Sequence, residues 1–148
     1  QNVETLAWVP LAIADPSRFA AQPQLLLCHL FGAVEQPGIY QVSMGSPLQE
    51  LLNRAGGLTP GSRLQAIEVG GLAGGLLPPG SIDLPLEQDA MTRKGAMVGT
   101  GSVMFIDQHH NLVDEALQAM AFFRAESCGR CTPCRVGTQE LVRLAALM

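Results

Sequence analysis

Apolar residues follow two different periods along this chain and divide it into three zones. From about residue 24 to residue 107, short apolar runs are separated by Gly and Pro turn residues, which is typical of strands. From about residue 108 onward, apolar residues recur every three to four positions, which is typical of helices. Residues 3–14 predict a helix that is interrupted at Pro10. We therefore expect three units, which are residues 1–23, 24–107 and 108–148.

The middle zone opens with a predicted hairpin. Residues 25–34 and 39–42 are strand-like, and they flank a turn in which Pro37 presets φ and Gly38 supplies a positive φ. Further strands are expected at residues 64–71 and 101–107, with a loop rich in Gly and Pro between them.

One helix is predicted inside this zone. Ser46 is expected to be its N-cap, with Pro47 at the first helical position and Glu50 closing a capping box. Gly56 is expected to end the helix. A small α+β domain, in which a sheet curls round one helix, accounts for this order of elements.

The third zone predicts two helical stretches joined by a cysteine-rich segment. Asn111 is expected to cap the first helix, which ends just before the cysteines. Its apolar positions recur at helical spacing and are Leu112, Val113, Ala116, Leu117, Met120 and Phe123. Residues 141–148 predict a second amphipathic helix with Leu141, Leu144 and Met148 on one face.

Composition restricts the classes of partner. The net charge is −4 and the nine Lys and Arg residues form no basic run, so we expect no nucleic acid partner. The longest apolar stretch, residues 25–31, is far shorter than a membrane span, and we expect no direct membrane insertion. Closely spaced cysteines favour a shared metal centre over disulfides, which indicates a reducing, cytoplasmic compartment.

The Cys-x-x-Cys-x-x-Cys segment carries the chemistry. Cys128, Cys131 and Cys134 are spaced so that three sulfurs surround one small centre, while Gly129 and Pro133 bend the backbone. An iron–sulfur cluster fits this spacing best. A structural zinc site usually takes two separated pairs of ligands, so zinc is a weaker alternative, and merely buried or redox-active thiols are a third.

A four-iron cluster needs a fourth ligand, and the chain offers none that is convincing. Cys28 lies in an apolar strand, where a small buried hydrophobe is its commoner role. His109 and His110 are separated from Cys128 by a helix of about 25 Å and are better explained as polar loop residues. His29, next to Cys28, is the remaining candidate.

The segment "ESCGRCTPCRVG" resembles the cluster-binding signature of the NADH-oxidising flavoprotein subunit of respiratory complex I. Diaphorase subunits of NAD-linked hydrogenases and formate dehydrogenases share that signature. The resemblance extends over essentially the whole chain, in the order of the family, through "NVET", "FGAVEQPGIYQV", "GSPLQELLNRAGG" and "VGTGSVMFID".

This resemblance implies an identity for each unit. Residues 1–23 would end a flavin-binding domain, with Asn2 and Thr5 matching residues that touch the flavin mononucleotide (FMN). The middle unit would be a ubiquitin-like β-grasp domain of the soluble-ligand-binding (SLBB) type. The last would begin an α-helical bundle that binds a [4Fe-4S] cluster through Cys128, Cys131 and Cys134, with the family's fourth Cys expected beyond Met148.

The function implied by the resemblance is electron transfer. In the complete NADH dehydrogenase subunit, electrons would pass from NADH to FMN, then through the cluster to partner iron–sulfur subunits of a larger, membrane-associated complex. The residues that hold NADH lie before Gln1 in the family, so this chain alone is not expected to oxidise NADH. Two alternatives remain, which are a β-grasp module that binds a ligand or partner without redox activity and a domain stabilised by zinc.

Overall fold

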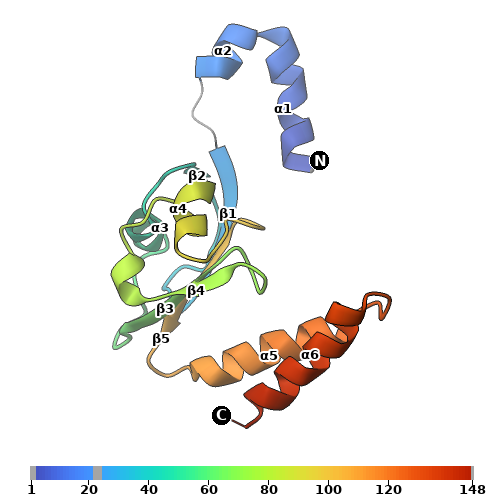
Figure 1. The fold of residues 1–148 in the computed structure, drawn as a ribbon. Coiled ribbons are helices and arrows are strands. Elements are labelled where there is room, and N and C mark those ends of the chain that lie inside the picture. Colours follow the sequence, from blue (N-terminus) through green and yellow to red (C-terminus); the bar gives the residue numbers. More distant parts are fainter. Residues whose placement is uncertain (1–2, 22–24, 148) are drawn as a thin grey trace.

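The computed structural model describes residues 3–21 and 25–147 and contains an N-terminal helical segment, a mixed sheet and a C-terminal helical hairpin (Figure 1). The boundary predicted between residues 23 and 24 lies outside the described residues. No helix of the described residues is long and apolar enough to cross a membrane.

The N-terminal segment consists of α1 (Val3–Ala14) and α2 (Pro16–Ala21). The predicted interruption at Pro10 is wrong, because α1 continues through the proline. A proline within a helix removes a single backbone donor, and the helical bonding resumes beyond it, where the Asp15 N–H donates to the Leu11 carbonyl at 2.9 Å. The Asp15 carboxylate then accepts from the Arg18 N–H at 2.9 Å and so caps α2.

Five strands form one sheet in the order β2-β1-β5-β3-β4. The strands β1 and β2 form the predicted antiparallel hairpin, and the Tyr40 hydroxyl donates to the Gln36 carbonyl at 2.7 Å across its turn. β5 lies between β1 and β3, parallel to β1 and antiparallel to β3, so the sheet is mixed. The strand bounds are β1 (Leu25–Gly32), β2 (Gly38–Ser43), β3 (Leu64–Val69), β4 (Gly75–Leu77) and β5 (Ser102–Asp107).

Helix α3 (Leu48–Arg54) packs its apolar side against one face of this sheet (Figure 1). Leu51 of the helix and Leu30, Ile67 and Phe105 of the strands are completely buried in one core. Cys28 of β1 belongs to the same core, as expected of a small buried hydrophobe. The polar faces of the elements remain in water, which is the arrangement that apolar burial favours.

The start of α3 differs from the prediction. The helix begins after Pro47, which takes the N-cap place without a side-chain hydrogen bond, and the Ser46–Glu50 capping box is not formed. The Ser46 backbone is used elsewhere, since its carbonyl accepts from the Leu86 N–H at 2.9 Å. Glu50 instead pairs with Arg54 at 2.7 Å.

The end of α3 is as predicted. Gly56 has φ +84°, a conformation that glycine adopts without strain, and its N–H donates to the Asn53 carbonyl at 3.1 Å. The Gly57 N–H donates to the Leu52 carbonyl at 2.9 Å, which completes a Schellman motif.

The segment between β3 and β5 contains elements that the sequence pattern did not predict. β4 lies in the expected Gly- and Pro-rich loop, and it pairs with β3 at the edge of the sheet. The 3₁₀ turn Pro79–Ser81 and the helix α4 (Gln88–Arg93) follow it. Ala90 and Met91 of α4 are buried, so this short helix closes the core beside α3.

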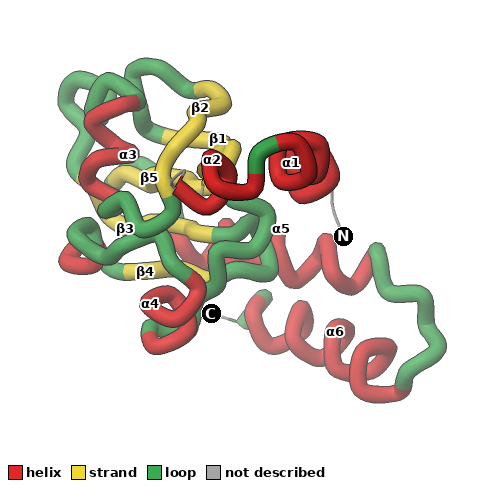
Figure 2. Tube along the Cα trace, turned by 90° about the horizontal axis from the view of Figure 1, so that it is seen from above, coloured by secondary structure: helices red, strands yellow, loops and turns green. Residues whose placement is uncertain are grey.

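The C-terminal region is a hairpin of two helices that lie side by side (Figures 1 and 2). In α5 (Leu112–Ala125) the predicted cap is confirmed, because the Asn111 side chain accepts from the Val113 N–H at 3.0 Å. The second helix, α6 (Thr132–Ala145), starts within the cysteine segment, nine residues earlier than the stretch predicted from residue 141. No residue of α5 is buried, so the hairpin is exposed over most of its surface.

Candidate metal centre

The three cysteines of the C-terminal region lie on one short loop and the helix turn that follows it. Cys128 is in the loop between α5 and α6, Cys131 occupies the N-cap place of α6, and Cys134 lies in its first turn. Gly129 turns the loop with φ +74°, and nothing lies within 4 Å of where a side chain would stand. Pro133 near the start of α6 favours a helix beginning there.

Side chains of the loop hold it in this shape. The Ser127 hydroxyl lies 3.3 Å from the sulfur of Cys134 and also accepts from the Gly129 N–H at 3.3 Å. The Arg135 guanidinium donates to the Gly129 carbonyl at 3.3 Å. Hydrogen bonds therefore join both halves of the loop to the first turns of α6.

All three thiols are free and exposed. Within residues 3–21 and 25–147, however, no group of three His, Cys, Asp or Glu side chains converges closely enough to hold a metal ion. The structure therefore brings Cys128, Cys131 and Cys134 onto one loop without gathering their sulfurs into a coordination sphere.

The donor set nevertheless fits a thiolate-bound cluster. Three unpaired thiols within seven residues supply soft sulfur ligands, and the N-terminus of α6 beside them favours the negative charge of a cluster held by thiolates. The open space around Gly129 leaves the loop able to approach an inorganic core closely.

The fourth-ligand candidates of the sequence lie away from this loop. Cys28 is fully buried between the sheet and α3, where desolvation raises the pKa of its thiol to about 12. His29 stacks on Phe31 with ring centroids 4.6 Å apart on the opposite side of β1. His109 and His110 lie before α5, at the other end of that helix from Cys128.

A polar cluster at the junction of β5 and α5 was missed by the sequence reasoning. The Asp107 carboxylate accepts from the Ser62 hydroxyl at 2.6 Å and from the His109 N–H at 3.1 Å, and it lies 2.9 Å from Nδ1 of His110. These hydrogen bonds, led by that of Ser62 and then that of His110, lower the pKa of Asp107 to about 2. The serine contacts the carboxylate and not the imidazole, so the three residue types do not form a nucleophilic triad.

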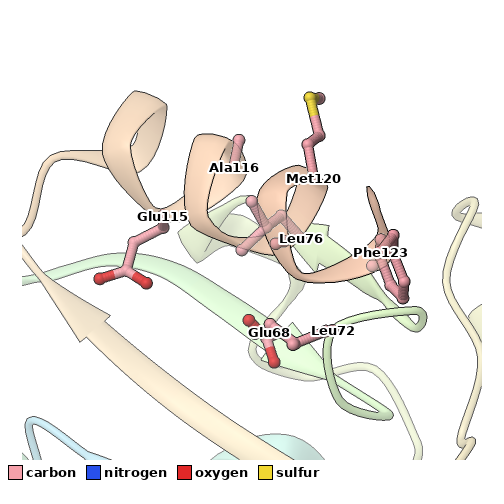
Figure 3. Close-up of a pocket in the computed structure, with 9 residues that line it drawn as sticks. Glu68, Leu72, Leu76, Glu115, Ala116, Met120 and Phe123 are labelled. Carbon is pink, nitrogen blue, oxygen red and sulfur yellow. The ribbon is translucent and has the colours of Figure 1, made fainter. Parts of the chain in front are cut away.

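A groove of about 240 Å³ separates the sheet from α5. Figure 3 shows Leu76 of β4 beneath the helix, with Glu68 and Glu115 on the same side. Burial raises the pKa of Glu68, and the nearby charge of Glu115 raises it further. The groove is lined by Glu68, Leu72, Gly75, Leu76, Glu115, Ala116, Ala119, Met120 and Phe123.

The two residues matched to flavin contacts lie at the N-terminal end. Thr5 is exposed on α1, and Asn2 lies outside the described residues. In Figure 1, α1 and the α5–α6 hairpin lie at opposite ends of the sheet, so the structure does not bring these residues together with the cysteines.

Comparison with known families identifies two regions of the chain. Residues 29–84 match the SLBB domain, and residues 114–148 match the NADH-ubiquinone oxidoreductase-F iron-sulfur binding region. The second match contains Cys128, Cys131 and Cys134.

Individual relatives are similar over nearly the whole chain. One of the NADH-quinone oxidoreductase F subunits of Rhizobium meliloti is 37% identical over 97% of this chain and 36% of its own length. The corresponding figures are 32%, 97% and 34% for the NADH-quinone oxidoreductase F protein of Escherichia coli and 29%, 97% and 31% for the NADP-reducing hydrogenase subunit HndC of Solidesulfovibrio fructosivorans. The chain thus spans about a third of the length of these relatives.

A solved structure shares the fold. A chain of NAD+-reducing [NiFe]-hydrogenase in the air-oxidised state superposes with a TM-score of 0.82 at 32% sequence identity. The superposition covers 99% of this chain and 26% of the hydrogenase chain. The combination of a mixed sheet and a following helical hairpin is therefore found in an oxidoreductase subunit.

Proposed function

Since the chain belongs to the family of the F subunits of NADH-quinone oxidoreductases and related hydrogenase subunits, we propose that it transfers electrons through a [4Fe-4S] cluster. Cys128, Cys131 and Cys134 supply three of the ligands. The observation that carries the proposal is that these three thiols are free, exposed and on one short loop, inside the region that matches the family's iron–sulfur-binding region. The fourth ligand is a cysteine outside residues 1–148.

The protein's part in this function is to hold the cluster and set its surroundings. A bound cluster of this kind accepts and releases electrons one at a time. The first turn of α6 directs backbone N–H groups toward the site, and the helix dipole favours negative charge there. Arg135 fixes the turn at Gly129, and thereby the spacing between Cys128 and Cys131.

The remainder of the chain has a supporting part in this proposal. Residues 24–107 form a β-grasp domain of the SLBB type, which is supported by the mixed sheet packed around α3 and by the SLBB match. Residues 108–148 begin the iron–sulfur-binding helical bundle. Residues 1–23 end the flavin-binding domain, with Asn2 and Thr5 touching FMN.

The complete subunit then receives electrons from NADH through FMN and passes them to partner iron–sulfur subunits. Support comes from the relatives, which are named as subunits of NADH-quinone oxidoreductase and of NADP-reducing hydrogenase. Such a subunit would be cytoplasmic and would reach a membrane only through its complex.

The test is anaerobic iron, sulfide and zinc analysis of the complete subunit, with electron paramagnetic resonance (EPR) after reduction. We expect about four irons per chain, and we expect the Cys131→Ala variant to lose them while the Cys28→Ala variant keeps them. Full iron in Cys131→Ala would remove the ligand assignment, and zinc in place of iron would remove the electron-transfer function.

A binding module without redox activity is the second candidate. One observation favours it, which is that the sulfurs of the described chain do not converge into a metal site. The same measurement decides, because the module predicts neither iron nor sulfide in the complete subunit.

A further inference from the structure

The hydroxyl of Ser127 is the polar side-chain group closest to a ligand sulfur on the loop, 3.3 Å from Sγ of Cys134. Building on the proposed function, we propose that Ser127 donates an O–H···S hydrogen bond to the Cys134 thiolate and thereby raises the reduction potential of the cluster. Ser127 is then a positioning and tuning residue, and it is not itself a ligand.

The direction of the hydrogen bond follows from the partners of the hydroxyl. A backbone N–H can only donate, so the 3.3 Å contact from Gly129 occupies an acceptor position of the Ser127 oxygen. The oxygen's own hydrogen is left to donate. A cysteine that binds iron has lost its proton and can only accept, so the Ser127 hydrogen is directed to the sulfur of Cys134.

The surrounding contacts keep the two groups in place. Ser127 directly follows the C-cap of α5, while Cys134 is in the first turn of α6, so the hydrogen bond joins the two ends of the loop. The Cys134 carbonyl accepts from the Thr138 hydroxyl at 2.7 Å, and Arg135 donates to Gly129. Ser127 is half-buried, which limits the access of water that would compete for the sulfur.

A hydrogen bond to a ligand sulfur withdraws electron density from it. The reduced cluster carries one more negative charge than the oxidised cluster, so the hydrogen bond stabilises the reduced state more. We expect the ratio of reduced to oxidised cluster at a fixed potential to fall about fivefold when the donor is removed, the equivalent of one ordinary hydrogen bond.

The experiment is an EPR-monitored redox titration of the complete subunit with its cluster. Ser127→Ala and Ser127→Gly remove the donor, and Ser127→Thr keeps the hydroxyl on the same carbon. Thr132→Val is the matched control, since it removes a neighbouring hydroxyl for which the described structure gives no contact to a cysteine sulfur. Iron and sulfide contents are measured first, so that a failure of the proposed cluster is recognised before any potential is compared.

We expect all variants that hold four irons to titrate as the parent does, except Ser127→Ala and Ser127→Gly, which titrate at lower potential. An unchanged midpoint in either hydroxyl-free variant with full iron would overturn the proposal. Loss of iron from both hydroxyl-free variants, with iron kept in Ser127→Thr, would also reject a tuning role and show that the hydroxyl is needed to assemble the site. Absence of iron from the parent would instead contradict the proposed function.

Discussion

At the scale of single residues, burial decides which thiols of this chain can react. Cys28 has no exposed surface, and its pKa is raised to about 12, whereas Cys128, Cys131 and Cys134 are exposed. The thiolate is the reactive form, so Cys28 is doubly protected, by access and by charge state.

We expect iodoacetamide at pH 8 to modify three thiols of the metal-free chain rapidly and the fourth only after unfolding. Mass spectrometry of peptides identifies the slow position as Cys28. The Cys28→Ala variant is the control and should show the same three fast sites with no slow one. A fast reaction at Cys28 in the folded chain would contradict the buried position of that strand residue.

Asp107 makes acid stability depend on a single carboxylate. Its pKa is about 2 in the folded state against an ordinary value of 3.8, so the folded state binds the proton less tightly than the unfolded state. The stability that this group contributes is therefore complete above about pH 4 and is lost as the pH falls toward 2.

We expect Asp107→Asn to lower the melting temperature at pH 7 and to lose less stability than the parent between pH 4 and pH 2. Thermal unfolding followed by circular dichroism across this range measures both. The exposed Asp83→Asn substitution is the control. Parallel pH profiles for the parent and Asp107→Asn would show that Ser62 and His110 do not hold the carboxylate as described.

Local chemistry explains which residues the sequence predicted correctly. Gly56 and Asn111 act through hydrogen bonds within a few residues of themselves, and the cysteines act through their spacing. Ser46 failed as a cap because its backbone is used by Leu86, forty residues away. The Asp107 cluster was missed for the same reason, since Ser62 meets it only after β3 and β5 pair.

At the scale of elements, the contact between α5 and the sheet contains two carboxylates. Glu68 has its pKa raised, mainly by burial and further by Glu115. A raised carboxyl pKa means that the folded state binds the proton more tightly, so stability is lost as the pH rises from about 4.5 through the folded value. At neutral pH these charges therefore weaken the contact between β3 and α5.

We expect Glu68→Gln to stabilise the chain by about 0.5 kcal/mol at pH 7, the size of a partly exposed charge interaction. The gain should disappear near pH 4, where the parent carboxyl is protonated as well. Urea unfolding at both pH values provides the measurement, with the exposed Glu35→Gln as control. A stabilisation that is equal at pH 4 and pH 7 would exclude a charge effect.

The elements predicted least well are short or depend on partners. β4 has three residues and α4 has six, too few for a period to be recognised in the sequence. The early start of α6 was missed because its first turn is made of cysteine, proline and polar residues, without the apolar repeat of residues 141–148. By contrast, β1, β2, β3, β5 and α5 are long enough for their patterns to be read directly.

At the scale of the whole molecule, apolar surface remains exposed at both ends. Half of the Leu141 and Leu144 side-chain surface on α6 is exposed, at 50% and 52%, and the apolar side chains of α1 that remain exposed are Val3, Leu6, Val9 and Ile13. Exposed apolar surface of this kind favours association.

We expect the chain made alone to associate as its concentration rises, and the double variant Leu141→Glu with Leu144→Glu to associate less. Light scattering over a concentration series measures the change in average mass. The charge-matched control is Gln139→Glu with Ala146→Glu, which adds the same charge at exposed positions of α6. Equal masses for the double variant and its control would attribute the effect to charge alone.

The order of three units was predictable from the sequence because each has its own hydrophobic period. The order of strands within the sheet was not, because the pairing of β1 with β5 joins His29 to Ser102, roughly seventy residues apart. Such contacts are decided by how whole elements pack, which no local pattern records.

The position of β5 also sets a sequence of events during synthesis. The β1–β2 hairpin forms from neighbouring residues, but β1 and β3 have no common partner until residues 102–107 have left the ribosome. The cysteine loop follows only about twenty residues later. The nascent chain therefore completes its sheet just before it exposes its three reactive sulfurs, so that iron delivery meets a formed support instead of an open coil.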